Sequence, residues 1–240
     1  MRIEVLFPEL CNLFGDAMNA EYLRRAVPEA EVTKTALKTN PAFSSGEVSL
    51  IYMGSMTERG QSLAAEALRP HRARISELID NGTVFLVTGN ALELFGTRIE
   101  NEDGSHFETL GMFDMYAKRQ MMRRYNSIYL GTFEDMEIVG FKSQFAHSYD
   151  GGGRNAPALF KTLRGAGRQP GQTEEGVRIN NFFATYVLGP LLILNPRFTR
   201  YMLGLLGEGE RELPYEREAL ASYEARLKEF HDPKTGEEYG

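Results

Sequence analysis

The chain has 240 residues, 42% of them hydrophobic and 25% charged, with a formal net charge of −6 and a pI of about 5.4. These values are ordinary for a globular protein, and they exclude a disordered tail, a collagen-like chain and a disulfide-stapled miniprotein. They also argue against a nucleic-acid partner, because nucleic-acid-binding domains usually have a pI above about 9.

The single cysteine, Cys11, excludes an internal disulfide and fits a reducing compartment. The first ten residues lack the pattern of a signal peptide. No apolar run approaches the ~18 residues that a membrane span needs. We therefore expect a cytoplasmic protein with no membrane span. The sequence has no phosphate-binding glycine loop and no metal-ligand spacing, so we expect no cofactor and no metal.

The first 96 residues alternate strand and helix patterns. Short apolar or β-branched runs predict strands at residues 3–7, 31–36, 48–53 and 83–88. Asp16 is expected to cap a helix through Val27, and Thr57 a long helix that ends at Asn81-Gly82. Strands that alternate with helices predict an α/β fold, with a mostly parallel central sheet and helices on both faces.

The second half of the chain has weaker patterns. We expect strands at residues 127–132, 136–142 and 182–187, a helix from Asn195-Pro196 through Leu205, and a Gly-, Arg- and Pro-rich surface loop at residues 149–175. Residues 207–214 form a predicted polar linker, and residues 215–230 a predicted amphipathic helix. We therefore divide the chain into a domain at residues 1–206 and a linker with a helical tail at residues 207–240.

Two turns at the ends of apolar strands are the best places for chemistry. One follows residues 83–88 and begins with Gly89 and Asn90, and the other contains Gly54 and Ser55. Ligands of open α/β sheets bind beyond the carboxyl ends of the strands. A sharp strand-to-helix turn exposes a nucleophile, and the backbone N–H groups of a neighbouring turn form an oxyanion hole.

Several segments carry a resemblance to a known family. Residues 6–16 (LFPELCNLFGD) resemble an LYPDLLNLYGD opening, and residues 51–55 (IYMGS) with Gln61 resemble an IGGG…Q segment. Residues 176–178 (GVR) and 185–192 (TYVLGPLL), followed by Asn195-Pro196, resemble EGV-R and TYLHGPLL…NP. Over residues 2–206 the chain is thus similar to class I glutamine amidotransferases of the cobyric-acid-synthase (CobB/CobQ) type, and more closely to the glutaminase subunit of lipid II isoglutaminyl synthases. The resemblance implies a flavodoxin-like fold.

The departures from this family matter more than the matches. In the family the strand-to-helix turn reads CGGYQ, and its Cys attacks the carboxamide of glutamine. That Cys falls on Gly89 here, and the catalytic His of TYLHGP falls on Leu188. Covalent catalysis by this route needs a thiolate and a base, and neither Gly nor Leu supplies one. The sequence therefore predicts an amidotransferase-like chain with no intact catalytic residue.

The resemblance also implies a set of pocket residues. A guanidinium suits a substrate carboxylate, and Arg123 and Arg124 both lie near the family's substrate-binding Arg. The sequence does not choose between them. A His of the family falls on Gln144, and His147 is either a residue of the pocket rim or, as we favour, a core or surface His. The expected pocket residues are Gly54, Ser55, Asn90, Arg123, Arg124, Gln144 and Tyr186.

Other groups were weighed as functional residues and interpreted as structural. Ser55 could reach the expected site but has no His or Lys partner, so we interpret it as a turn residue. The side chain of Thr88 is expected to point along its strand, and Cys11 is expected to be a partly buried small apolar residue. The predicted loop carries Arg154, Lys161, Arg164 and Arg168, which suit either a phosphate-bearing partner or, as we favour, solvent.

Three functions remain open from the sequence. The first, which we favour, is a catalytically silent subunit that docks on a Mur-ligase-like, ATP-dependent partner in cell-wall or cobyric-acid-type amidation. The second is an active glutaminase or amidotransferase with non-standard catalytic residues. The third is a stand-alone protein that binds a small molecule.

Overall fold

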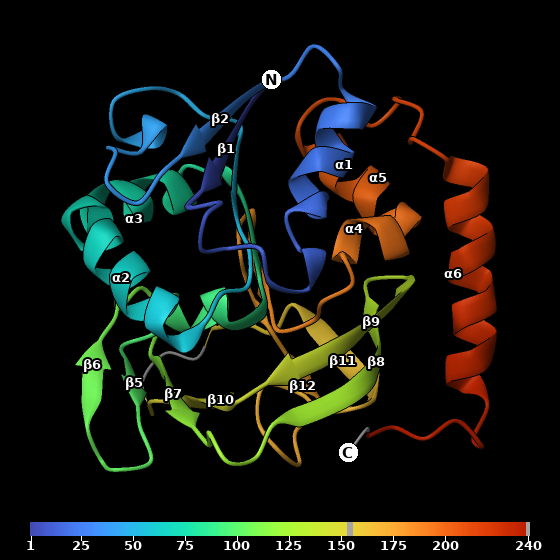
Figure 1. Ribbon diagram of the computed structural model, residues 1–240. Coiled ribbons are helices and arrows are strands. Elements are labelled where there is room, and N and C mark those ends of the chain that lie inside the picture. The colour runs from blue at the N-terminus through green and yellow to red at the C-terminus, as the bar shows by residue number, and fades with distance from the viewer. Residues whose placement is uncertain (153–155, 239–240) are drawn as a thin grey trace.

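The computed structural model describes residues 1–152 and 156–238. Its centre is a six-stranded sheet with the order β13-β14-β4-β3-β1-β2 (Figure 1). Every neighbouring pair is parallel except β13 and β14, so the expected mostly parallel sheet is confirmed. The strands are β1 (Arg2–Leu6), β2 (Glu31–Thr35), β3 (Leu50–Met53), β4 (Val84–Thr88), β13 (Val177–Ile179) and β14 (Phe182–Thr185).

Helices cover both faces of this sheet, as predicted (Figure 1). On one face, α2 (Glu58–Leu68) and α3 (Arg72–Asp80) pack into a first hydrophobic core. On the other face, α1 (Met18–Ala26), α4 (Leu191–Leu194) and α5 (Pro196–Leu205) pack into a second core. The strands β3 and β4 lie between the two cores and are buried at every residue. Burial on both faces explains their continuous apolar sequences.

The start of α1 differs from the prediction. Its N-cap residue is Ala17, which has no side-chain cap, and the Ala17 amide donates instead to Oδ1 of Asn12. Asp16 therefore does not cap this helix. Its carboxylate turns inward, because the Ser55 amide and the Thr88 hydroxyl donate to it there, together with the nearby Asn19 side chain. A short 3-10 turn, η1 (Leu13–Gly15), precedes it.

The single long helix expected after Thr57 is wrong in one respect. Thr57 caps α2 as predicted, by accepting a hydrogen bond from the amide of Gly60. The helix then breaks at a 3-10 turn, η3 (Arg69–His71), before α3 begins. Pro70 lies inside that turn, and proline removes a backbone donor and clashes with the preceding turn of an α-helix. Two further 3-10 segments are η2 (Ala42–Ser44) and η4 (Gly89–Phe95).

The middle of the chain forms two further four-stranded sheets, with orders β10-β7-β5-β6 and β12-β11-β8-β9. The strands β8 and β9, which pair as a hairpin, were predicted, and the four strands of the first of these sheets were not. Three of those four are short or mixed in polarity, which hides them in the sequence. The strands are β5 (Arg98–Glu100), β6 (His106–Glu108), β7 (Met115–Arg119), β8 (Tyr125–Phe133), β9 (Met136–Gln144), β10 (Ala146–Asp150), β11 (Phe160–Arg164) and β12 (Glu174–Glu175).

The prediction of a surface loop at residues 149–175 is also wrong, because this segment contains the strands β11 and β12. Phe160 and Thr162 point inward between exposed residues, an alternation that the flanking Gly and Arg residues obscured. The basic residues there do not form one solvated cluster. Arg168 is 2% exposed, whereas Lys161 is exposed. Arg154 lies outside the described residues.

The last helix, α6 (Glu216–His231), packs its Tyr223 and Phe230 against the β8–β9 hairpin. Arg164 then holds the segment after it, by donating to the carbonyl oxygens of Phe230, Asp232 and Thr235. At the end of that segment, Glu238 forms an antiparallel bridge with Ser127 of β8. Within the described residues, no helix is both long and apolar enough to cross a membrane.

Candidate functional site

The turn after β4 is the centre of the candidate site. Gly89 begins η4 there with φ of +64°, a left-handed conformation that favours glycine. A Cβ atom added at Gly89 would lie 2.5 Å from Cβ of Ser55 and 3.2 Å from Cδ2 of Leu188. The three residues therefore contact one another, and no side chain fits at Gly89 without movement of Ser55.

Leu188 is fixed in this position by its backbone. Its amide donates to the carbonyl oxygen of Phe141 at 2.9 Å, and its own carbonyl accepts from the Phe141 amide at 3.1 Å. This bridge joins the chain after β14 to β9. Leu188 is 1% exposed, so its side chain closes one side of the turn that Gly89 forms.

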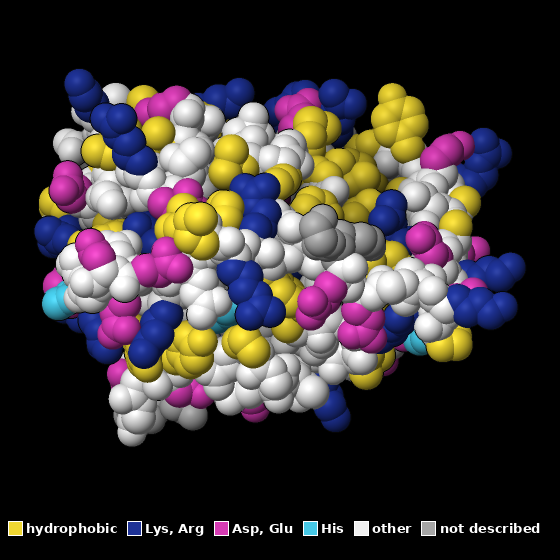
Figure 2. All heavy atoms as spheres, turned by 60° about the horizontal axis from the view of Figure 1, so that its bottom comes forward, with side chains coloured by type: hydrophobic (Ala, Val, Ile, Leu, Met, Phe, Trp, Pro, Cys, Tyr) yellow, Lys and Arg dark blue, Asp and Glu magenta, His cyan; other side chains and the backbone are white. Residues whose placement is uncertain are grey.

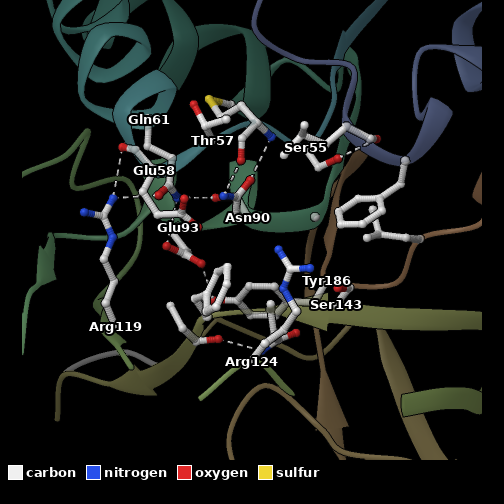
Figure 3. Close-up of a pocket in the computed structure, with 18 residues that line it drawn as sticks. Ser55, Thr57, Glu58, Gln61, Asn90, Glu93, Arg119, Arg124, Ser143 and Tyr186 are labelled. Carbon is white, nitrogen blue, oxygen red and sulfur yellow. Dashed lines mark hydrogen bonds between the residues drawn. The ribbon is translucent and has the colours of Figure 1, made fainter. Parts of the chain in front are cut away.

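A cavity of about 210 Å³ opens beside Gly89, at the carboxyl ends of the central strands (Figure 3). The structure brings most of the predicted pocket residues together around it. Those that line it are Ser55, Gly89, Asn90, Arg124, Gln144, Tyr186 and Leu188. Gly54 and Arg123 do not line it, and Arg124 is thereby the arginine of the pair that faces the cavity.

Gly54 lies behind the cavity wall. A Cβ atom at Gly54 would lie 2.8 Å from the Cys11 carbonyl oxygen and 2.9 Å from the Tyr52 hydroxyl. Glycine is therefore required at this position for packing. His147 also stays out of the cavity lining and is only 7% exposed, so of the surface and core positions that the sequence left open it takes the core one.

The backbone N–H groups of the turn beside Gly89 are already bonded within the protein. The Ser55 amide donates to Oδ2 of Asp16, and the Met56 amide donates to Oδ1 of Asn90, each at 3.0 Å. Nδ2 of Asn90 also donates to the Met56 carbonyl at 2.8 Å. The Asn90 side chain thus pairs with both backbone groups of Met56 (Figure 3). Neither amide is free to hold an oxyanion in this arrangement.

Asp16 is a site residue that the sequence analysis assigned to the wrong role. It is 1% exposed, and its carboxylate accepts hydrogen bonds from Oγ1 of Thr88 at 2.5 Å and Nδ2 of Asn19 at 2.8 Å, besides the Ser55 amide. Burial raises the pKa of Asp16, and the hydrogen bonds from Thr88 and Ser55 partly oppose that shift. The residue ties the segment before α1 to the ends of β3 and β4.

Glu93 is a second site residue that the sequence did not single out. It lies on the cavity wall, is 2% exposed, and accepts from Nε2 of Gln61 at 2.8 Å and the Tyr186 hydroxyl at 3.2 Å (Figure 3). Burial raises its pKa to about 7, although Gln61, Arg119 and Tyr186 favour the charged form. The signal available in the sequence was one acidic residue inside an otherwise apolar run, residues 91–95 (ALELF).

Arg119 and Arg124 approach the cavity from different sides. Nη2 of Arg119 donates to Oε1 of Gln61 at 2.7 Å, so Arg119 belongs to the Glu93 cluster. The Arg124 guanidinium lies over the ring of Phe145, 4.5 Å from its centroid, and extends toward the open middle of the cavity (Figure 3). Among the described residues, Arg124 has no carboxylate partner.

Comparison with known proteins identifies the family. Residues 2–195 match the model of the CobB/CobQ-like glutamine amidotransferase domain. The chain belongs to this family. Its curated relatives include two proteins named lipid II isoglutaminyl synthase (glutamine-hydrolyzing) subunit GatD. The protein from Staphylococcus aureus is 25% identical over 207 residues, covering 85% of this chain and 83% of the relative. The protein from Streptococcus pneumoniae is 24% identical over 199 residues, covering 81% and 76%.

Solved structures agree on the fold of this amidotransferase-family chain. One glutamine amidotransferase has a TM-score of 0.56 and 16% identity, and the match covers 85% of this chain and 98% of that chain. Another, from Thermotoga maritima, has a TM-score of 0.51 and 11% identity, with 95% and 97% covered. At such identities the likeness concerns the fold, and it confirms the predicted class I amidotransferase architecture.

Other nucleophiles near the cavity are poorly placed for the chemistry of this family. Cys11 is 2% exposed, and burial raises the pKa of its thiol to about 12, so the thiolate is scarce at neutral pH. Oγ of Ser55 donates to the Leu13 carbonyl, which is not a base. Thr88 is fully buried and does not line the cavity.

The contact between Gly89 and Ser55 predicts coupled effects on stability. Gly89→Ala should lower the free energy of unfolding by about 2–5 kcal/mol, the sum of a left-handed backbone cost and overpacking. In a Ser55→Gly background the same change should cost at least ~1 kcal/mol less, because the Cβ that obstructs it is gone. Urea denaturation measures both values.

Gly104 provides the matched control for that cycle. It has φ of +81° and nothing within 4 Å of an added Cβ, so Gly104→Ala isolates the backbone cost. An equal cost of Gly89→Ala with and without Ser55 would contradict the contact.

The buried Glu93 predicts a pH-dependent contribution to stability. Its pKa rises from 4.5 to about 7 on folding, so the folded state binds the proton more tightly. The contribution of Glu93 is therefore complete below pH ~4.5 and is lost as the pH rises through about 7. Relative to Glu93→Gln, the wild-type chain should lose up to about 3 kcal/mol of unfolding free energy between pH 4.5 and 8.

Urea denaturation across that pH range measures the difference between the two proteins. Glu224→Gln, at an exposed position on α6, serves as the matched control for a change of one surface charge. A constant difference between wild type and Glu93→Gln would show that the Glu93 carboxyl does not change its proton affinity on folding.

Proposed function

We propose that this chain is a catalytically silent amidotransferase-like subunit, which docks on a Mur-ligase-like, ATP-dependent partner in cell-wall or cobyric-acid-type amidation. The contact of Gly89 with Ser55 and Leu188 carries the proposal. The family resemblance assigns the nucleophile to the position of Gly89 and the base to that of Leu188. A Cβ atom at Gly89 would lie only 2.5 Å from Ser55.

The hydrogen bonds of the turn after β3, which contains Ser55 and Met56, support the same proposal. Attack on a carboxamide develops negative charge on its oxygen, and amidotransferase chemistry needs donors for that charge. Here the Ser55 and Met56 amides donate to Asp16 and Asn90 instead. The site thus lacks the nucleophile and the base of the family, and two amides of the turn after β3 are bonded within the protein.

The relatives support the choice of partner and pathway. Both curated relatives are named as subunits of a lipid II isoglutaminyl synthase, and the match covers 83% and 76% of their lengths. A subunit of this kind without glutaminase activity leaves its ligase partner to use free ammonia or another amine. Its own contribution is then to shape or regulate the partner's site.

A second candidate function is favoured by the cavity. It holds about 210 Å³ and is lined by Arg124 and by the buried carboxyl group of Glu93. This volume is below the ~300–1,000 Å³ of most small-molecule pockets, so in a stand-alone binding protein it would suit a ligand of only a few heavy atoms. An active enzyme with non-standard residues has less support, since Cys11 is buried with a raised thiol pKa and the Ser55 hydroxyl donates to the Leu13 carbonyl.

Two measurements test the proposed function. The chain carries an amino-terminal tag, is recovered from its native cell, and its co-purifying proteins are identified by mass spectrometry. The same material is assayed for ammonia release from glutamine, alongside a Cys11→Ser variant. We expect a Mur-ligase-like protein in stoichiometric amount and no glutamine hydrolysis by the tagged chain.

Each contrary outcome points to another function. A tagged chain that elutes alone favours the stand-alone binding protein. Glutamine hydrolysis that disappears in Cys11→Ser assigns the activity to the only thiol of the chain. Hydrolysis that persists in that variant requires a mechanism without a thiol.

Restoring the family residues step by step gives a further prediction. Gly89→Cys with Leu188→His should show at most weak glutaminase activity, because Ser55 displaces the new thiol and Asn90 still occupies the Met56 amide. Adding Ser55→Gly and Asn90→Gly should raise the rate at least tenfold, since both obstructions are removed. Near-full activity of the first double variant would show that these two residues do not block the site.

A further inference from the structure

Two segments that reach the cavity carry most of the exposed apolar side chains. Of the eight large apolar side chains that are exposed among the described residues, five lie within residues 13–18 and 121–122, and of these Leu13 and Phe14 line the cavity while the other three are close in sequence to residues that do. The five are Leu13, Phe14, Met18, Met121 and Met122, with exposures of 37%, 42%, 39%, 40% and 94%. Single exposed apolar residues are common on proteins, but clusters of them mark interaction sites.

Phe14 is held at the mouth by a strained backbone. Its φ of +61° is rare for a residue other than glycine and costs roughly 1–2 kcal/mol. The segment is kept there by paired bonds, in which the Leu13 amide donates to the Ser55 carbonyl and Oγ of Ser55 donates to the Leu13 carbonyl. The Phe14 ring meets Phe141 edge-on at 5.9 Å and still remains 42% exposed. Strain that displays an apolar ring at a cavity mouth is typical of a binding surface.

The cavity presents an exposed arginine in a chain whose net charge is −6. Glu58 and Glu93 lie on the cavity wall close to Arg119, which offsets one negative charge, and burial raises the pKa of Glu93 to about 7. Arg123 and Arg124 are exposed, and neither forms an ion pair with another described residue. Arg124 is therefore the cation that the cavity offers to a ligand. Figure 2 shows apolar (yellow) and basic (dark blue) side chains, with acidic ones (magenta) among them, over the upper half of one face of the molecule.

The inner end of the cavity offers few contacts, so it favours a ligand that does not reach deep into it. Ser55, Gly89 and Leu188 close it, and the donors of the turn are bonded internally. An occupant therefore gains little from reaching the end of the cavity. Most of its contacts lie at the mouth, on Phe14 and Arg124. Arginine, methionine and aromatic residues are the side chains enriched in protein interfaces.

We infer that the cavity mouth is a socket for a segment of the partner protein, which pairs a carboxylate side chain with Arg124 and packs a large apolar side chain on Leu13 and Phe14. This inference rests on the proposed function, since it takes the Mur-ligase-like partner as the occupant. It adds the place of docking and the chemistry of the docking segment. The emptied catalytic site thereby becomes a recognition site for protein.

Binding by matched variants tests the socket. The bait proteins are amino-terminally tagged wild type, Arg124→Glu, Phe14→Asn and the control Arg217→Glu. Asn tolerates the left-handed backbone at Phe14, so the ring is removed with little change in strain. Arg217 has a side chain that is 92% exposed and lies on α6, which does not line the cavity. Thermal unfolding of each purified bait shows that it is folded.

With equal amounts of each tagged protein, Arg124→Glu and Phe14→Asn should each recover at least tenfold less of the ligase than wild type does. Arg217→Glu should recover as much as wild type does. A photo-crosslinking residue in place of Met122 should then join the ligase, and the same residue in place of Arg217 should not. The crosslinked peptide identifies the docking segment. Replacing one Asp or Glu of that segment by Arg should restore binding to Arg124→Glu.

The contrary results separate the two proposals. If wild type recovers no Mur-ligase-like protein, the proposed function fails, and the socket fails with it. If wild type recovers the ligase and both mouth variants recover it equally well, the socket is wrong and the proposed function stands. Crosslinking of Met122 to a second copy of the chain also overturns the socket. The socket is also overturned if no replacement of an Asp or Glu by Arg in the crosslinked segment restores binding to Arg124→Glu.

Discussion

The Asp16 carboxylate bonds parts of the chain that lie up to 72 residues apart in the sequence. It accepts from the hydroxyl of Thr88 at the end of β4, from the amide of Ser55 after β3 and from the side chain of Asn19 in α1. Burying a carboxylate is costly, and these donors offset the loss of water. The positions of Gly89 and of the cavity follow from this, because both adjoin the strand ends that Asp16 holds.

Asn90 completes the arrangement from the other side. Its amide pairs with the N–H and C=O groups of Met56, in the way that a neighbouring strand would. The two turns that a family member uses for a nucleophile and for oxyanion donors are thus joined to each other. The same fold therefore supports a different use of the strand ends: in place of groups that react, it presents a rigid wall with Phe14 and Arg124 around its opening.

The sequence predicted the parts of this structure that depend on burial. β3 and β4 are continuous apolar runs because both of their faces are covered, and the turn at Gly89 follows directly from where β4 ends. It also placed Asn90, Arg124 and Tyr186 around one cavity through the family resemblance.

The parts that the sequence missed depend on long-range pairing. Asp16 has the local pattern of a helix cap, and only the folded chain shows that Thr88 and Ser55, both distant in sequence, donate to its carboxylate. β11 looked like loop because Gly and Arg flank its two inward side chains. Pro70 was an available signal for the break between α2 and α3. Glu93 was one acidic residue in an apolar run, and its partners Gln61 and Tyr186 come from distant segments.

The hydrogen bonds by which Arg164 holds the segment after α6 decide at which end this protein is best tagged. Glu238 is joined to Ser127 of β8, the strand that begins directly after Arg124. A fusion domain attached at the carboxyl end would therefore start close to the cavity mouth. The amino terminus lies at the opposite end of the molecule (Figure 1). Immobilisation through that end leaves the mouth open, whereas a carboxyl-terminal fusion would compete with whatever docks there.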